Sequence, residues 1–301
     1  MKETRIKPVK IKKRRLKYIA VLPSFITLMN GTCGFIAIVF ACRSVEIRWN
    51  VLFVRNLNMS SIALAGYMIF LAMIADMLDG RVARLTRTTS SFGGQLDSLS
   101  DAISFGVAPA FLMYKLAERH IDRLDFDHFR FSLLIMRSIF FSAIFYAMCA
   151  IVRLARFNVE NEENEAAHMN FAGLPSPAAA GVIVSLVIIQ QQILPRITAR
   201  TPDMVKTIDI ISISALPIIT LLSGLLMVSR IRYPHLANQL LRGKKSLAML
   251  LALFACGLFI IWNLQLAMVV GFCGFALFGV FRWIILGIFR KPLRPPSEVK
   301  T

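Results

Sequence analysis

Acidic residues are scarce in this 301-residue chain, and charged residues of either sign are few. Asp and Glu number 17 against 35 Lys and Arg, and charged residues amount to 17% of the sequence. Hydrophobic residues reach 56%, and the mean hydropathy is +0.64. Such a composition is too apolar for an ordinary soluble domain. The shortage of charge therefore excludes most soluble folds and indicates a membrane protein.

Cysteine and histidine are also rare. The five cysteines are odd in number, lack any CxxC pairing and mostly fall in apolar runs. We therefore expect free, buried thiols rather than disulfides or a zinc site. The four histidines fall in expected loops without HExxH-like spacing, so we assign no role to His120, His128, His168 and His235.

Long apolar runs fill most of the chain. A membrane-spanning helix needs about 20 apolar residues to cross roughly 30 Å of hydrocarbon. Eight runs are candidates, at residues 20–42, 60–84, 94–117, 131–152, 171–194, 208–229, 246–263 and 265–289. The last two are joined by a very short link and should form a tight hairpin. The predicted fold is all-α, a polytopic membrane helix bundle.

Basic residues are unevenly distributed between the loops on the two sides of this bundle. The segments on one side hold 23 Lys and Arg, and the loops 43–59, 115–130 and 195–208 on the other side hold 10. The positive-inside rule then places both termini and the loop at 80–92 on the cytoplasmic side of an inner membrane. The basic first 18 residues should attract anionic lipid head groups. We therefore expect membrane lipids, and no nucleic acid, as partners of this positive charge.

Four aspartates interrupt the apolar pattern in the stretch DMLDGRVARLTRTTSSFGGQLDSLSD, residues 76–101. Asp76 and Asp79 are spaced i, i+3, and Asp97 and Asp101 are spaced i, i+4, so each pair projects from one face of a helix. A polar turn joins the two helices and makes them neighbours. Four converging carboxylates repel one another unless cations hold them, and oxygen-only ligands favour Mg²⁺ or Mn²⁺. We predict that all four aspartates are metal ligands at the cytoplasmic edge of the membrane.

Two glycines and an arginine beside these aspartates indicate a phosphate-bearing substrate. Gly80 and Gly93 remove side chains where a ligand approaches the backbone, and Arg84 suits a bidentate phosphate contact. Two other interpretations stay open at this point. The aspartates could be solvated in a polar loop, or they could serve a cation transporter or channel.

The spacing D-x2-D-G-x2-A-R-x8-G-x3-D-x3-D resembles the signature of the CDP-alcohol phosphatidyltransferases. Every fixed position is filled, by Asp76, Asp79, Gly80, Ala83, Arg84, Gly93, Asp97 and Asp101. The resemblance implies a six-helix catalytic core, to which the last two spans look like an addition, and a homodimer. The expected division is a basic tail (1–19), the core (20–229), a basic loop (230–245), an additional hairpin (246–289) and a C-terminal tail (290–301).

The resemblance also implies a role for each residue of the site. Asp76, Asp79 and Asp97 would hold metal, and Asp101 would be both near the metal and the general base. An acceptor hydroxyl would attack the lipid-side phosphorus of a CDP-linked lipid, and CMP would leave. The nucleotide and the CDP-lipid would contact Thr27, Asn30, Gly80, Ala83, Arg84, Ser90 and Gly93. For Thr27 and Asn30, polar packing between helices is an alternative.

Two further stretches bear on the acceptor. CAIVRLARFNV (149–159) and FAGLPSPAAAG (171–181) resemble the bacterial-type phosphatidylserine synthase branch of the family. Arg153, Arg156 and Asn158 would then bind a lipid phosphate or the carboxylate of L-serine, although positive-inside anchoring also explains either arginine. Pro175 and Pro177 would shape the start of a helix.

The reaction that we expect is transfer of a phosphatidyl group from CDP-diacylglycerol to L-serine. Glycerol 3-phosphate, inositol or an inositol phosphate stay open as acceptors, because the two arginines do not exclude them. An ether-linked donor would present the same CDP head group and stays open too.

Overall fold

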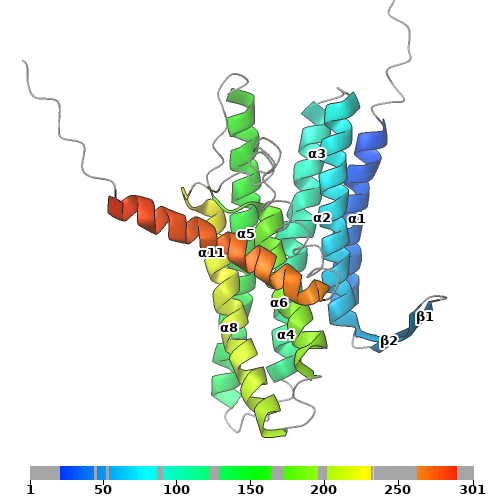
Figure 1. Cartoon of the computed structure of the whole chain (residues 1–301), viewed down its shortest axis with the longest axis vertical. Helices are drawn as coiled ribbons and strands as arrows, with labels where there is room; N and C mark the ends of the chain where they lie inside the picture. Colours follow the sequence, from blue (N-terminus) through cyan, green and yellow to red (C-terminus); the bar gives the residue numbers. More distant parts are fainter. Residues whose placement is uncertain are drawn as a thin grey trace, which may run out of the picture.

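The computed structural model of this chain describes residues 21–43, 46–51, 54–86, 91–121, 129–163, 173–195, 202–231, 233 and 263–289. The elements in this part are α1 (Val21–Cys42), β1 (Glu46–Val51), β2 (Val54–Ser60), α2 (Ser61–Thr86), α3 (Ser91–Asp101), the π-helix η2 (Ala102–Val107), α4 (Ala108–Ile121), α5 (Phe129–Glu163), α6 (Ser176–Gln192), α8 (Pro202–Val228) and α11 (Leu264–Phe289) (Figure 1). The predicted all-α, polytopic helical fold is confirmed.

Five segments of the described residues are long and apolar enough to cross a membrane. They are Ser24–Cys42, Ser61–Val82, Phe92–Ile121, Leu133–Val159 and Leu264–Ile285. Two shorter apolar helices, Ser176–Gln192 and Ser214–Val228, lie among them. Residues 246–262 of the predicted span at 246–263 lie outside the described residues. Seven of the eight predicted spans therefore correspond to helices, and the chain is an integral membrane protein.

The helices form a bundle with two distinct ends (Figure 1). The start of α1, the end of α2, the start of α3 and the end of α5 lie at one end, and the β1–β2 hairpin lies at the other. α1 packs on α2 and α3, α5 packs on α8, and α11 crosses α6 obliquely. The segment that carries the aspartates therefore lies at the same end as the expected cytoplasmic tail.

Helix α5 is longer than the sequence pattern indicated. The predicted span ended at 152, but α5 continues to Glu163. No proline or glycine interrupts Phe129–Glu163, and its Glu, Ala and Arg residues favour helix. Arg153, Arg156 and Asn158 consequently lie on one continuous helix instead of at its frayed end.

Helix α6 starts later than predicted, at Ser176 instead of 171. Pro175 precedes the helix with extended backbone angles, and Pro177 follows in the first turn, where a missing N–H costs nothing. The prediction that these prolines shape the helix start is confirmed. Gly173, just before them, has φ +90°, a left-handed conformation that glycine adopts without strain.

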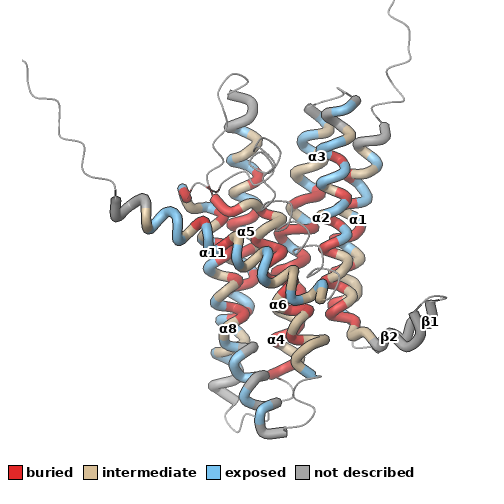
Figure 2. The backbone as a smooth tube through the Cα atoms, viewed as in Figure 1, coloured by how far each residue is buried: buried red, intermediate tan, exposed pale blue. Residues whose placement is uncertain are grey.

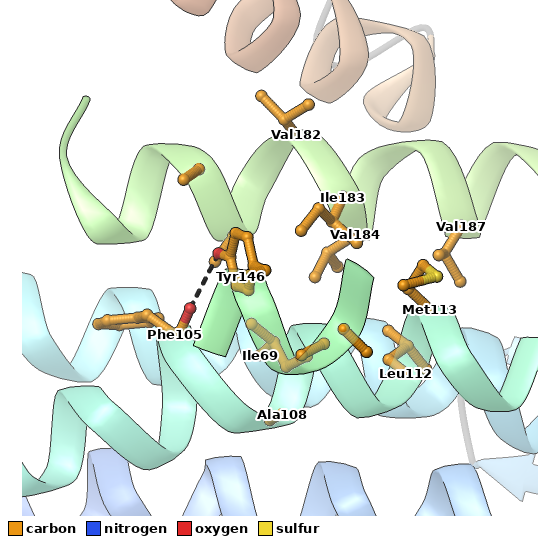
Figure 3. Packing of buried hydrophobic residues seen from close by; sticks show 14 of the residues in the cluster. Ile69, Phe105, Ala108, Leu112, Met113, Tyr146, Val182, Ile183, Val184 and Val187 are labelled. Carbon is orange, nitrogen blue, oxygen red and sulfur yellow. Dashed lines mark hydrogen bonds between the residues drawn. The ribbon is translucent and has the colours of Figure 1, made fainter. Parts of the chain in front are cut away.

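A π-helix, η2, follows Asp101 directly and continues into α4. Pro109 lacks the N–H that would bond the carbonyl of Phe105 in an α-helix. The hydroxyl of the fully buried Tyr146, on α5, donates to that carbonyl instead, at 2.9 Å (Figure 3). π-helical turns are often found at functional sites. This one sets the backbone conformation of the residues that directly follow Asp101.

The core lies where α2, α4, α5 and α6 meet, at mid-length of the bundle (Figure 2). Ile69, Leu112 and Ile183 are among its fully buried side chains, and Figure 3 shows them on facing helices. Gly34 of α1 contacts η2 so closely that an added Cβ would lie 2.5 Å from Ser104 Oγ and 2.7 Å from Ser104 Cα. This contact holds α1 against the segment that follows Asp101.

Three local predictions need correction. The outer loop 43–59 contains the antiparallel β1–β2 hairpin. Cys33 and Cys149 are buried free thiols, as predicted, but Cys42 is exposed. His120 lies in the last turn of α4, where it is buried and hydrogen-bonded to Gln190 at 2.9 Å, instead of in a loop.

Replacing Gly34 with alanine tests the contact between α1 and η2. The added methyl group overlaps the Ser104 backbone, so we expect Gly34→Ala to lower the free energy of unfolding by about 1–3 kcal/mol. Gly274→Ala is the matched control, because nothing lies within 4 Å of a Cβ at that exposed helical position. The melting temperatures of both variants in detergent decide the matter. Equal melting temperatures would contradict the close packing of α1 on η2.

Candidate active site

Three of the four aspartates converge at the end of the bundle where α2 ends and α3 begins. One carboxylate oxygen from each of Asp76, Asp97 and Asp101 lies within 4.8 Å of the other two. Asp76 comes from α2, and Asp97 and Asp101 come from successive turns of α3. The helical spacing predicted convergence of all four aspartates, and the structure brings these three together. Asp101 is only 9% exposed, and Asp76 and Asp97 are partly buried.

Asp79, the fourth aspartate, lies beside this group without belonging to it. Its carboxylate is 8% exposed and interacts electrostatically with Asp76 and Asp97. One oxygen, Oδ2, accepts a 2.5 Å hydrogen bond from Thr27 Oγ1, whereas Oδ1 is buried and has no hydrogen-bond partner. A buried carboxylate oxygen without a partner is costly, so a ligand is the natural occupant of that position.

Two polar residues of α1 hold the aspartates in place. Thr27 donates to Asp79, and Asn30 Nδ2 donates to Asp101 Oδ1 at 2.8 Å. Both side chains are almost completely buried, at 2% and 0% exposed. The sequence interpretation placed them at the nucleotide, with helix packing as the alternative. The described contacts give them a third role, in orienting carboxylates.

The contact between α1 and the α3–η2 segment is tight at this level. Ser104 Oγ donates to the Asn30 carbonyl at 2.8 Å, and Ser100 faces Gly31. Small residues on both sides let the helices approach closely enough for side-chain hydrogen bonds. The position of Asp101 is therefore set from α1 on one side and by η2 on the other.

Helix α5 brings the predicted acceptor-binding residues to the same end. Arg153 is partly buried and interacts electrostatically with Asp101. Asn158 Nδ2 donates to Ser98 Oγ at 2.9 Å, on the turn between Asp97 and Asp101. Arg156 is exposed. Of these two arginines, Arg153 is thus the one that interacts with the carboxylates.

The structure describes only some of the remaining residues that were predicted to contact the nucleotide. Gly80 is exposed on α2, and Gly93 is partly buried on α3. Ala83 and Arg84 belong to α2, but their side chains are not described, and Ser90 lies outside the described residues. Their assignment to the nucleotide stays a prediction.

Two residues that contact the site were not singled out from the sequence. Ser98 bonds Asn158, and Ser176 accepts a 2.5 Å hydrogen bond from Arg153 Nη1. Ser176 lies in the stretch FAGLPSPAAAG, which carried the resemblance to the phosphatidylserine synthase branch, but only its two prolines were given a role, at the helix start. Its position directly before Pro177, at a helix start on the same side of the membrane as Arg153, is the signal that could have identified it.

The donor set fits a hard divalent cation. All the converging ligand atoms are carboxylate oxygens, and the group lies in a partly buried place where three negative charges repel one another. The partnerless Oδ1 of Asp79 adds a further oxygen beside them. Asp76, Asp97 and Asp101, with Asp79 beside them, are therefore the residues that could hold Mg²⁺ or Mn²⁺.

Removing one carboxylate of this group should weaken divalent-ion binding. We expect Asp76→Asn, Asp97→Asn and Asp101→Asn each to lower Mn²⁺ affinity at least about tenfold, because each takes away a negative ligand. Glu118→Gln, which removes a carboxylate paired with Lys115 near the end of α4, serves as control. Calorimetric titration with Mn²⁺ checks this. Equal affinities in the Asp and Glu118 variants would contradict the site.

Substitutions of Thr27 separate a role in bracing Asp79 from a role in packing. Thr27→Val keeps the shape but removes the donor to Asp79, whereas Thr27→Ser keeps the hydroxyl. A hydrogen bond to a charged group contributes about 1.5–3 kcal/mol, so Thr27→Val should lower Mn²⁺ affinity about tenfold and Thr27→Ser should not. If the two variants bind Mn²⁺ alike in the same titration, the bracing role is wrong.

Comparison with known proteins agrees with this geometry. The model of the CDP-alcohol phosphatidyltransferase family matches residues 20–231. This range includes the converging aspartates, Thr27, Asn30 and Arg153, and it ends before α11. The match covers well over half of the chain.

Several curated relatives are about one third identical to the chain. The CDP-diacylglycerol–serine O-phosphatidyltransferase of Methanocaldococcus jannaschii is 32% identical over 225 residues, 75% of this chain and 79% of that protein. The protein of the same name from Helicobacter pylori is 33% identical over 223 residues, 74% and 81% of the two chains. The archaetidylserine synthase of Methanothermobacter thermautotrophicus is 33% identical over 174 residues, 57% and 60%. The chain belongs to the CDP-alcohol phosphatidyltransferase family.

Proposed function

We propose that this protein transfers a phosphatidyl group from CDP-diacylglycerol to the hydroxyl of L-serine, giving phosphatidylserine and CMP. The single observation that carries the proposal is the convergence of Asp76, Asp97 and Asp101 with Arg153 beside Asp101. Carboxylates suit a metal-bound pyrophosphate, and a neighbouring guanidinium suits an anionic acceptor. The relatives named for serine transfer support L-serine as that acceptor.

Asp101 is the proposed general base. As the serine hydroxyl oxygen forms its bond to the lipid-side phosphorus, the hydroxyl proton moves to an Asp101 carboxylate oxygen. The bond from that phosphorus to the bridging oxygen breaks, and CMP leaves with the electron pair. Asn30 donates to Asp101 Oδ1, which leaves Oδ2 to accept the proton.

Asp76, Asp79 and Asp97 are the other proposed ligands of Mg²⁺ or Mn²⁺. When bound, the ion supplies positive charge that offsets the charge of the pyrophosphate oxygens. The chain's own part is to keep these carboxylates in place. Thr27 does this for Asp79, and the shared α3 backbone does it for Asp97 and Asp101.

The acceptor side is formed by α5. Arg153 would bind the carboxylate of serine, because a planar guanidinium matches a carboxylate with two parallel donors. Arg156 is exposed at the same end and would meet a lipid phosphate, while Asn158 orients the α3 turn through Ser98. Gly80, Ala83, Arg84, Ser90 and Gly93 are the proposed contacts of the nucleotide.

The site would lie on the cytoplasmic side, with both termini, as the distribution of basic residues predicts. A homodimer stays a prediction of the family resemblance. The similarity to an archaetidylserine synthase favours one variation, an ether-linked donor lipid with the same acceptor. That variation leaves the roles of Asp101 and Arg153 unchanged, since the lipid tails lie away from the reacting phosphorus.

Release of CMP by the purified protein tests the proposal. We expect release from CDP-diacylglycerol to require L-serine and Mn²⁺ or Mg²⁺, and to fall at least about a thousandfold in Asp101→Asn, which cannot accept the proton. Parallel reactions contain glycerol 3-phosphate, myo-inositol or an ether-linked CDP-lipid. Glu118→Gln is the control for the aspartate variant.

Three results would contradict different parts of the proposal. Release with another acceptor but not with serine would reject the acceptor and keep the aspartate chemistry. Full activity in Asp101→Asn would reject the general base. No release with any acceptor, in protein with a normal melting temperature, would favour the cation transporter instead.

A further inference from the structure

We propose that Ser176 is a positioning residue for the acceptor site, because its hydroxyl fixes the Arg153 guanidinium beside Asp101. This inference deepens the proposed function and rests on it, since that function assigns Arg153 to the acceptor. It gives the turn before α6 a part in recognition of the acceptor carboxylate.

The contact between the two side chains is direct and buried. Arg153 Nη1 donates to Ser176 Oγ at 2.5 Å, across from α5 to α6. Ser176 is 0% exposed, so water does not compete for its hydroxyl. Arg153 Nε is buried and makes no hydrogen bond. Among the described residues, the Ser176 hydroxyl is therefore the hydrogen-bond partner that fixes the direction of the Arg153 guanidinium plane.

A neutral partner suits this role better than a carboxylate would. A carboxylate at position 176 would neutralise Arg153 and compete with an anionic acceptor. The hydroxyl accepts one N–H and leaves the full positive charge available. Arg153 can therefore be held in one orientation and still attract the carboxylate of serine.

The turn that carries Ser176 is itself held firmly. The N–H of Gly173 donates to the Ile231 carbonyl at 2.8 Å, and the N–H of Leu174 donates to the Leu226 carbonyl at 3.0 Å. A Cβ on Gly173 would lie 2.2 Å from the Met227 carbonyl oxygen, and the φ of +90° disfavours any other residue. These contacts with the end of α8 thus fix where along the bundle α6 begins, and they thereby fix the position of Ser176.

Helix α11 supports the same segment from outside the region that the family model matches. Tyr233, two residues after Ile231, donates to the Ala276 carbonyl of α11 at 3.3 Å and packs against Phe275, with ring centroids 5.4 Å apart. Contacts of Tyr233 with α11, of Ile231 with the Gly173 turn, and of Ser176 with Arg153 therefore link α11 to the acceptor site. Through this route the additional helix stabilises the acceptor site.

Steady-state kinetics of Ser176→Ala tests the proposal. We expect the KM for L-serine to rise about tenfold, because the substitution removes one charge-assisted hydrogen bond to Arg153. The kcat and the KM for CDP-diacylglycerol should change less than about twofold. Ser185→Ala is the matched control, since Ser185 is equally buried on α6 but bonds only the local Val182 carbonyl. If Ser176→Ala does not fold, Ser176→Cys, which is nearly isosteric and a weak acceptor, replaces it.

A double mutant separates action through Arg153 from a general effect on packing. In an Arg153→Met background, Ser176→Ala should add no further rise in the KM for serine, because the group it positions is gone. An equal rise in both backgrounds, or Ser176→Ala kinetics identical to those of Ser185→Ala, would overturn the proposal.

Failure of the role proposed for Ser176 can be distinguished from failure of the proposed function. If the wild-type protein uses another acceptor and not L-serine, the assignment of serine is wrong. The same comparison of KM values, made with that other acceptor, then decides the role of Ser176. Wild-type protein that releases no CMP with any acceptor overturns both.

Discussion

Mutual repulsion of carboxylates at the edge of a membrane is the constraint on which the rest of this structure depends. Asp76, Asp97 and Asp101 place oxygens within 4.8 Å of one another, in partly buried positions. Like charges this close raise the free energy of the folded chain unless a cation and oriented donors compensate. The donors come from α1, through Thr27 and Asn30. Helix α1 lies outside the aspartate motif at 76–101, but its side chains are needed to orient the aspartates of that motif.

The surrounding helices convert that local requirement into a fixed geometry. Gly34 lets α1 contact η2, and Tyr146 of α5 satisfies the carbonyl that Pro109 leaves free. α6 then meets α5 at Ser176 and Arg153. The site is therefore assembled from α1, α2, α3, α5 and the first residue of α6, while the apolar core at mid-length keeps these helices in register (Figure 2).

Regular spacing explains which features could be predicted from the sequence. The spans and the two aspartate pairs follow from length and from i, i+3 and i, i+4 repeats, which local helical geometry alone decides. The end of α5 was missed because the chain turns polar at Arg153 without ceasing to favour helix. The hairpin at 46–60 was missed because six- and seven-residue strands in a polar loop give little periodic signal. Asp79 was expected among the converging ligands, but it turns towards Thr27, a residue 52 positions away.

The sequence by itself determined that this protein lies in a membrane, that it is helical, and that its four aspartates are spaced as two pairs on neighbouring helices. These properties depend on hydrophobicity and on spacing within single helices. Only the tertiary structure decided which side chains hold those aspartates and that Arg153 interacts with Asp101. Such contacts join residues tens of positions apart, as in the pairs Asn30–Asp101 and Arg153–Ser176. They depend on how closely helices approach, which small residues and proline-induced turns set and local spacing does not encode.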